Sequence, residues 1–135
     1  MPRRVRRQQL PGLLAPRLLP GEELERIGGA WFARVPAGSR LLFVGRHYRW
    51  VALTDRRLLV FGRWSRSRRG PTPLLDAPLG SLRLDRVDGA RLLFAVLVDT
   101  GDGRSVVLEF RPRERVFGRE IVAALRTALS AVAPT

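Results

Sequence analysis

Apolar and polar residues alternate over short runs through the middle of the chain, and turn-forming residues separate these runs. Alternation with a period of two predicts β-strands that bury one face. In the run 105–111, for example, Val106, Leu108 and Phe110 point inward and the residues between them point outward. The pattern predicts strands over 40–45, 47–53, 57–64, 81–87, 91–99 and 105–111.

Turn signals between these runs favour antiparallel pairing. Asp88-Gly89 is a strong hairpin signal, and the sequence TGDGR at 100–104 reverses the chain before the last strand. The segment 21–35 fits two interpretations: Leu24, Ile27 and Trp31 suit a helix, whereas the glycine pair at 28 and 29 suits a bent first strand.

The hydrophobic period changes near residue 114. Apolar residues then recur at spacings of three and four, which predicts one amphipathic helix over about 114–133. Its apolar stripe consists of Phe117, Ile121, Leu125, Ala128 and Val132.

The composition is that of one globular domain with a large positive charge. The chain has 135 residues, with 25 basic and 12 acidic side chains for a net charge of +13, and all the basic residues are arginine. Such a field attracts nucleic acid, anionic lipid or an acidic protein. Arginine usage this uniform is also what codon bias in a GC-rich genome produces, so charge alone identifies no partner.

Residues 1–20 carry five arginines, no acidic residue and several prolines. Because proline interrupts helices, we expect a flexible basic tail, either disordered or touching an anionic surface. The folded domain is then predicted to be 21–135.

The sequence RWSRSRRG at 63–70, here called the arginine loop, has four arginines in eight residues. Arginine can bind two phosphate oxygens at once, and a tryptophan can lie at a membrane interface or stack on a base. The candidate anion-binding residues are Arg63, Trp64, Arg66, Arg68 and Arg69. The alternative is that these residues form the solvated tip of a loop, with Trp64 as the last core residue of its strand.

Several chemistries lack the residues that they require. Without cysteine and with one histidine, His47, a zinc site of nitrogen and sulfur ligands is not expected. Without lysine there is no Walker-type phosphate site. The acidic sequence GEELE at 21–25 is interpreted as a solvated patch that needs no metal. We therefore predict no enzyme activity, no catalytic residue, no metal and no cofactor.

The longest apolar run has seven residues, at 92–98, far short of the ~20 of a membrane-spanning helix.

Three segments carry a resemblance to a known family: LLPGEEL at 18–24, VALTDRRLLVF at 51–61 and EIVAALRTAL at 120–129. With them the chain resembles small bacterial pleckstrin-homology-like and GRAM-like domains over about 21–133. The resemblance implies a mainly β fold: a bent antiparallel sheet of about seven strands, forming a partly open barrel that one C-terminal helix caps.

The resemblance also implies a non-catalytic binding or scaffolding module. We expect it to engage an anionic membrane surface or an acidic protein, in the cytoplasm and at times at the inner face of the membrane. The alternative is a basic protein that binds nucleic acid without sequence preference. Eukaryotic relatives hold headgroups with basic residues between the first two strands, a position that has only Arg34 and Arg40 here.

Overall fold

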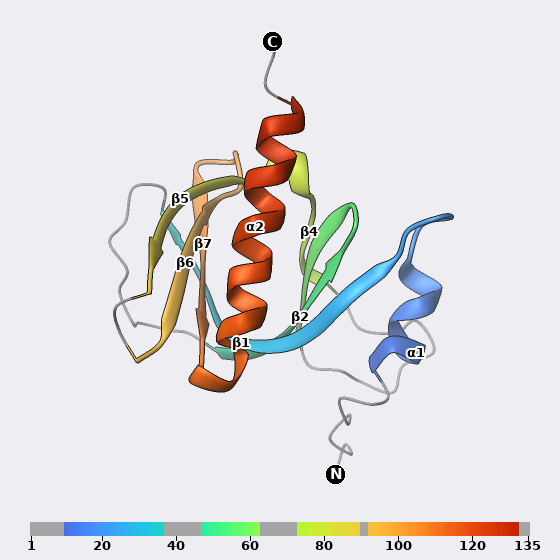
Figure 1. Cartoon of the computed structure of the whole chain (residues 1–135), viewed down its shortest axis with the longest axis horizontal. Coiled ribbons are helices and arrows are strands. Elements are labelled where there is room, and N and C mark those ends of the chain that lie inside the picture. Colours follow the sequence, from blue (N-terminus) through green and yellow to red (C-terminus); the bar gives the residue numbers. More distant parts are fainter. Residues whose placement is uncertain (1–9, 37–46, 63–72, 90–91, 133–135) are drawn as a thin grey trace.

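The computed structural model describes residues 10–36, 47–62, 73–89 and 92–132 (Figure 1). Two α-helices flank seven strands, with short 3-10 turns between them. The helices are α1 (Leu10–Leu14) and α2 (Arg115–Val132), and the turns are η2 (Ala15–Arg17), η3 (Leu79–Ser81) and η4 (Pro112–Glu114). The strands are β1 (Leu24–Pro36), β2 (His47–Thr54), β3 (Arg57–Phe61), β4 (Pro73–Pro78), β5 (Arg83–Asp88), β6 (Phe94–Asp99) and β7 (Arg104–Phe110).

The strands form one antiparallel sheet in the order β4-β3-β2-β1-β7-β6-β5. The sheet bends around α2, which lies along its hollow side (Figure 1). We call this side the inner face and the opposite side the outer face. The expected architecture, seven strands and one capping helix, is confirmed. The strand expected at 40–45 lies outside the described residues.

The main core fills the space between α2 and the inner face. The stripe that the helical period predicted points into it: Phe117, Ile121 and Leu125 are buried, and Ala128 packs against the same cluster. Val132 lies outside the described side chains. Each strand contributes alternate residues, such as Val106, Leu108 and Phe110 of β7, which are fully buried as predicted. One amphipathic helix therefore closes a single core.

The segment 21–35 is a strand and not a helix. The paired glycines explain why, because each lies directly under an aromatic ring. A Cβ atom on Gly28 would come within 2.4 Å of Phe117, and one on Gly29 within 2.1 Å of the Tyr48 hydroxyl. On the outer face Tyr48 contacts Trp31 edge-on, at 5.2 Å between ring centroids.

The expectation of a tail over 1–20 needs correction for residues 10–20. Helix α1 and turn η2 pack on the outer face of the sheet, and Leu14 is fully buried. Leu14 joins a second cluster, here called the outer cluster, of Ile27, Ala52, Leu59 and Phe61. The prolines limit helix length, as expected, but they do not prevent one leucine from filling an apolar site. Residues 1–9 lie outside the described residues.

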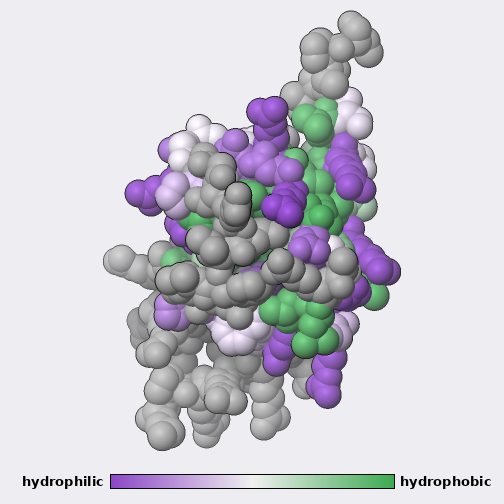
Figure 2. Space-filling model, turned by 90° about the vertical axis from the view of Figure 1, so that its left-hand side faces the viewer, coloured by the Kyte–Doolittle hydropathy of each residue, from purple (hydrophilic) through white to green (hydrophobic). Residues whose placement is uncertain are grey.

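The two edge strands carry features that discourage pairing with other chains. Strand β4 begins and ends with proline, and β5 exposes Arg83, Asp85 and Arg86. Figure 2 shows the side of the molecule on which β5 and β6 lie, where hydrophilic side chains surround smaller apolar areas.

Among the helices of the described ranges, none has the length and apolarity needed to cross a membrane.

Candidate anion-binding end of the sheet

The predicted anion-binding residues, Arg63, Trp64, Arg66, Arg68 and Arg69, all lie outside the described residues. What the structure does describe is the pair of strands that carries the arginine loop. Phe61, at the end of β3, pairs with Pro73, at the start of β4. The end of the sheet from which the loop leaves is therefore known.

Three connections leave the sheet at that end. Because neighbouring strands are antiparallel, the β1–β2, β3–β4 and β6–β7 connections all emerge on the same side. The register agrees: Pro36, the last residue of β1, pairs with Arg104, the first residue of β7. We call this side the loop end. The strand ends that flank the arginine loop, Phe61 and Pro73, therefore lie at the same end of the sheet as Pro36 and Arg104.

Three arginines lie on the inner face toward the loop end, on three adjacent strands. Strand alternation sets Arg34 after Ala30 and Phe32 of the core, Arg49 before Val51, and Arg104 before Val106. Sequence reasoning named Arg34 alone and missed Arg49 and Arg104. The signal was available, since each arginine occupies an inward position of an apolar-polar alternation.

The contacts of these arginines link the strands at the loop end. The Arg34 guanidinium donates a hydrogen bond to the carbonyl of Leu74, in the strand that follows the arginine loop. Arg34 and Arg104 also line a hollow of about 320 Å³ together with Gly103. The Nε of Arg49 is buried and has no hydrogen-bond partner within the described part of the chain. Guanidinium groups at this end of the sheet can donate hydrogen bonds to an anionic oxygen.

The β6–β7 connection is a tight turn, as its GDG sequence predicted. Gly101 and Gly103 have φ of 82° and 79°, a region that favours glycine. The Thr100 hydroxyl donates to Asp102 at 2.6 Å, which lowers the pKa of that carboxyl, and the nearby charge of Arg34 acts in the same direction. The negative charge of Asp102 therefore partly offsets the positive charge of Arg34 at the loop end.

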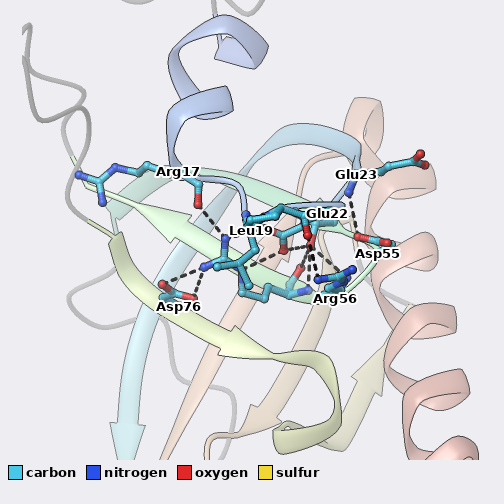
Figure 3. A network of polar contacts seen from close by, with 10 residues as sticks. Arg17, Leu19, Glu22, Glu23, Asp55, Arg56 and Asp76 are labelled. Carbon is cyan, nitrogen blue, oxygen red and sulfur yellow. Dashed lines mark hydrogen bonds and ion pairs between the residues drawn. The ribbon is translucent and has the colours of Figure 1, made fainter.

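A second polar group of residues lies at the opposite end of the sheet, at the β2–β3 hairpin (Figure 3). Its centre is an ion pair between Glu22 and Arg57, with Nη2 2.7 Å and Nε 2.9 Å from the two carboxylate oxygens. Thr54 donates to the same carboxylate at 2.7 Å, and the Leu19 amide donates to it at 2.9 Å. We call these four residues the hairpin network.

Arg57 also reaches beyond the hairpin network. It donates two bonds to Asp76 of β4, at 3.0 and 3.2 Å, and one to the carbonyl of Arg17, at 3.0 Å. Nearby, the Glu23 and Asp55 residues exchange hydrogen bonds of 2.9 and 3.0 Å (Figure 3). The segment before β1 is therefore fixed to the hairpin by charged and neutral bonds.

The interpretation of 21–25 as a solvated patch is wrong for Glu22, whose side chain is fully buried. Its hydrogen bonds with Arg57 lower its pKa from 4.5 to about 2, against the opposing effect of burial, and Leu19 and Thr54 contribute to the lowering. The same contacts raise the pKa of Arg57. Both groups are therefore charged at neutral pH, and the ion pair holds the segment before β1 against the β2–β3 hairpin.

Metal-binding side chains do not gather within the described ranges: no group of three His, Asp or Glu residues there could hold an ion. His47 lies exposed at the start of β2.

No protein-family model and no curated protein matches this chain, but solved structures do. An inhibited Vav1 superposes with a TM-score of 0.55 at 17% identity, over 83% of this chain and 28% of the Vav1 chain. The N-terminal PH domain of Vps36 superposes at 0.51 and 17% identity, over 84% of this chain and 86% of its own. The chain has the pleckstrin-homology-like fold.

A third neighbour agrees. The DH/PH domains of PDZ-RhoGEF, in complex with activated RhoA, superpose at 0.52 and 13% identity, over 88% of this chain and 34% of the other. This chain thus spans less than a third of the Vav1 chain and about a third of the PDZ-RhoGEF chain. At these identities the likeness concerns the fold, and the bacterial and GRAM-like parts of the resemblance stay predictions.

Proposed function

We propose that the chain is a non-catalytic binding module whose loop end engages an anionic membrane surface or an acidic protein partner. The observation that carries this proposal is the position of Arg34, Arg49 and Arg104 at the end of the sheet where β3 ends and β4 begins, the two strands that flank the arginine loop. In this proposal these three arginines and the arginine loop, which are far apart in the sequence, bind the same anionic surface.

The ligand chemistry is that of clustered phosphates or carboxylates. Guanidinium groups bind such oxygens in pairs, and the net charge of +13 attracts them over a distance. The strand ends that carry three neighbouring connections lie together at the loop end, and the hollow there measures only about 320 Å³. A broad anionic surface therefore suits this end better than a small ligand does. The module would then sit at the inner surface of the membrane without crossing it.

Vesicle binding tests the proposal. The full chain should bind vesicles of phosphatidylserine and phosphatidylcholine, and not vesicles of phosphatidylcholine alone. Changing Arg66, Arg68 and Arg69 to glutamate should weaken binding by about two orders of magnitude or more, because each basic contact contributes about 1 kcal/mol. The melting midpoint should stay unchanged, since exposed loop charges contribute little to stability.

The control reverses the same number of charges elsewhere, at Arg113, Arg119 and Arg126, which are exposed near or on α2. Arg115 is not suitable, because it donates to the carbonyls of Gly89 and Leu92. Equal loss in both variants, or no vesicle binding by the wild type, contradicts a site at the arginine loop. Binding to DNA of any sequence, with a steep loss of affinity as salt rises, would instead support the nucleic-acid alternative.

A further inference from the structure

A groove of about 540 Å³ lies at the opposite end of the sheet from the loop end, between α2 and the β2–β3 hairpin. Its floor is apolar, formed by Leu53, Leu79 and Ala124. Its rim is acidic and carries Glu25, Asp55 and Glu120. An apolar floor with an acidic rim is suited to a peptide segment that has both aliphatic and basic side chains.

The negative charge of this groove contrasts with the rest of the molecule. Glu120 is paired with Arg26 at 3.0 Å, so this carboxylate is largely neutralised. Glu25 is exposed, and Asp55 accepts one backbone hydrogen bond from Glu23. These two carboxylates stand in the field of a chain of net charge +13, and a basic segment that settles there gains attraction to them.

We propose that the groove binds the arginine-rich segment 1–9 of this same chain. The segment contains Arg3, Arg4, Arg6 and Arg7, one valine and no acidic residue. Its charge complements the rim, and Val5 between the arginine pairs suits the apolar floor. The groove would therefore be a recognition site for arginine-rich segments, with the chain's own segment as its occupant.

The segment joins the described chain close to the strand that carries part of the groove rim. Leu14 of α1 packs in the outer cluster, against which Leu24 also packs, and the next residue, Glu25, lines the groove. Leu10 precedes Leu14 by about one helical turn, or roughly 6 Å. In extended conformation the five steps from Leu10 back to Val5 span about 17 Å, and the nine steps back to Met1 span about 30 Å.

Binding within one molecule is favoured over binding between copies. A short tether holds the segment at an effective concentration in the millimolar range. Two copies, in contrast, repel one another through their net positive charge. The proposal does not depend on what the loop end binds.

The absence of cysteine allows a direct test on the full chain. A nitroxide on Gln8→Cys, which keeps the four arginines and Val5, should broaden the amide NMR signals of Asp55, Ala124 and Thr127 and leave those of Gly101 and Gly103 at the loop end intact. Reducing the nitroxide should restore the lost signals. At about 1 M salt, where the Debye length falls to about 3 Å, the broadening should largely disappear.

A pair of matched variants separates the groove from general charge effects. Combining Glu25→Gln with Asp55→Asn should abolish the broadening, and the asparagine keeps the acceptor for Glu23. Combining Asp85→Asn with Asp102→Asn removes the same charge from exposed sites that do not line the groove and should leave the broadening in place. Amide spectra without nitroxide check that both variants are folded.

Three outcomes would overturn the proposal. The first is broadening that is missing from the groove or spread evenly over the surface. The second is broadening that survives the groove variant. The third appears in a mixture of nitroxide-carrying chains with isotope-labelled chains that lack it: broadening there would mean that the occupant comes from a second copy.

Discussion

The inner and outer faces of the sheet are closed in different ways. On the inner face, the 18 residues of α2 cover a continuous core to which all seven strands contribute. On the outer face, the fully buried Leu14 is the leucine that the described side chains of α1 contribute to a small cluster, and the hairpin network holds the segment that follows. A large buried apolar area holds α2 on the inner face. A few specific polar bonds hold α1 and the segment after it on the outer face.

This difference determines how each helix responds to damage. The inner core distributes its free energy over many apolar contacts, so one truncation leaves most of it in place and only a buried charge disrupts it. The outer attachment depends on a few residues, and the loss of one partner leaves a buried charge unpaired. Three substitutions sharpen the contrast, ordered from the largest expected effect to the smallest.

Leu125→Arg should lower the free energy of unfolding by more than about 5 kcal/mol, because it removes a fully buried leucine and buries an unpaired charge. Chemical denaturation measures the loss. Leu129→Arg, on the exposed side of the same helix, is the control and should have little effect. A cooperatively folded Leu125→Arg variant with a nearly unchanged midpoint would mean that α2 does not close the core.

Arg57→Met should cost about 3–5 kcal/mol at pH 7, because it leaves the Glu22 carboxylate buried without its cation. The cost should shrink as the pH falls from about 4.5 toward about 2. In the wild type, Glu22 keeps its charge down to a pKa of about 2 while the unfolded chain takes up a proton near 4.5, so stability is lost over this interval. In the variant, Glu22 protonates earlier and the buried charge disappears.

Denaturation at pH 7 and pH 3 measures this difference. The adjacent Arg56→Met is the control: its side chain is exposed, and within the described ranges it donates one long bond of 3.4 Å, to the carbonyl of Pro20. An equal cost for Arg57→Met at both pH values would show that the residue acts through packing and not through the charge of Glu22.

Leu14→Ala should cost about 2 kcal/mol, at the low end for a buried leucine, since the outer cluster is small and α1 has room to adjust. Leu19→Ala, at a position 48% exposed, is the control. If Leu14→Ala leaves the unfolding midpoint unchanged, the contact of Leu14 with the outer cluster contributes nothing to stability.

The parts of the fold that repeat a pattern were predictable from the sequence. The helix stripe of Phe117, Ile121 and Leu125 and the inward residues of 105–111 follow periods of 3.6 and 2, which local geometry imposes. The attachment of α1 has no period. It rests on Leu14 filling a site formed by β1, β2 and β3, and two adjacent leucines between prolines carry no sign of their partners.

The candidate sites divide in the same way. Arg34, Arg49 and Arg104 could have been grouped from strand alternation once the strand order was known, because that order brings β7 beside β1. The pairing of Glu22 with Arg57 joins residues 35 positions apart. Its existence depends on the path of the chain before β1, which depends in turn on the outer cluster, so composition alone made 21–25 look solvated.

The strand order also has a consequence for synthesis on the ribosome. Strands β1 to β4 pair with their sequence neighbours and can assemble as soon as they emerge, but β1 must then wait for β7 on its other edge. Helix α2 follows later still, so the apolar inner side of the early strands, including Val51, Leu53 and Leu58, stays uncovered until the last element arrives. Nascent chains of this kind are exposed to misassembly during that interval, which makes α2 the element whose late arrival limits safe folding.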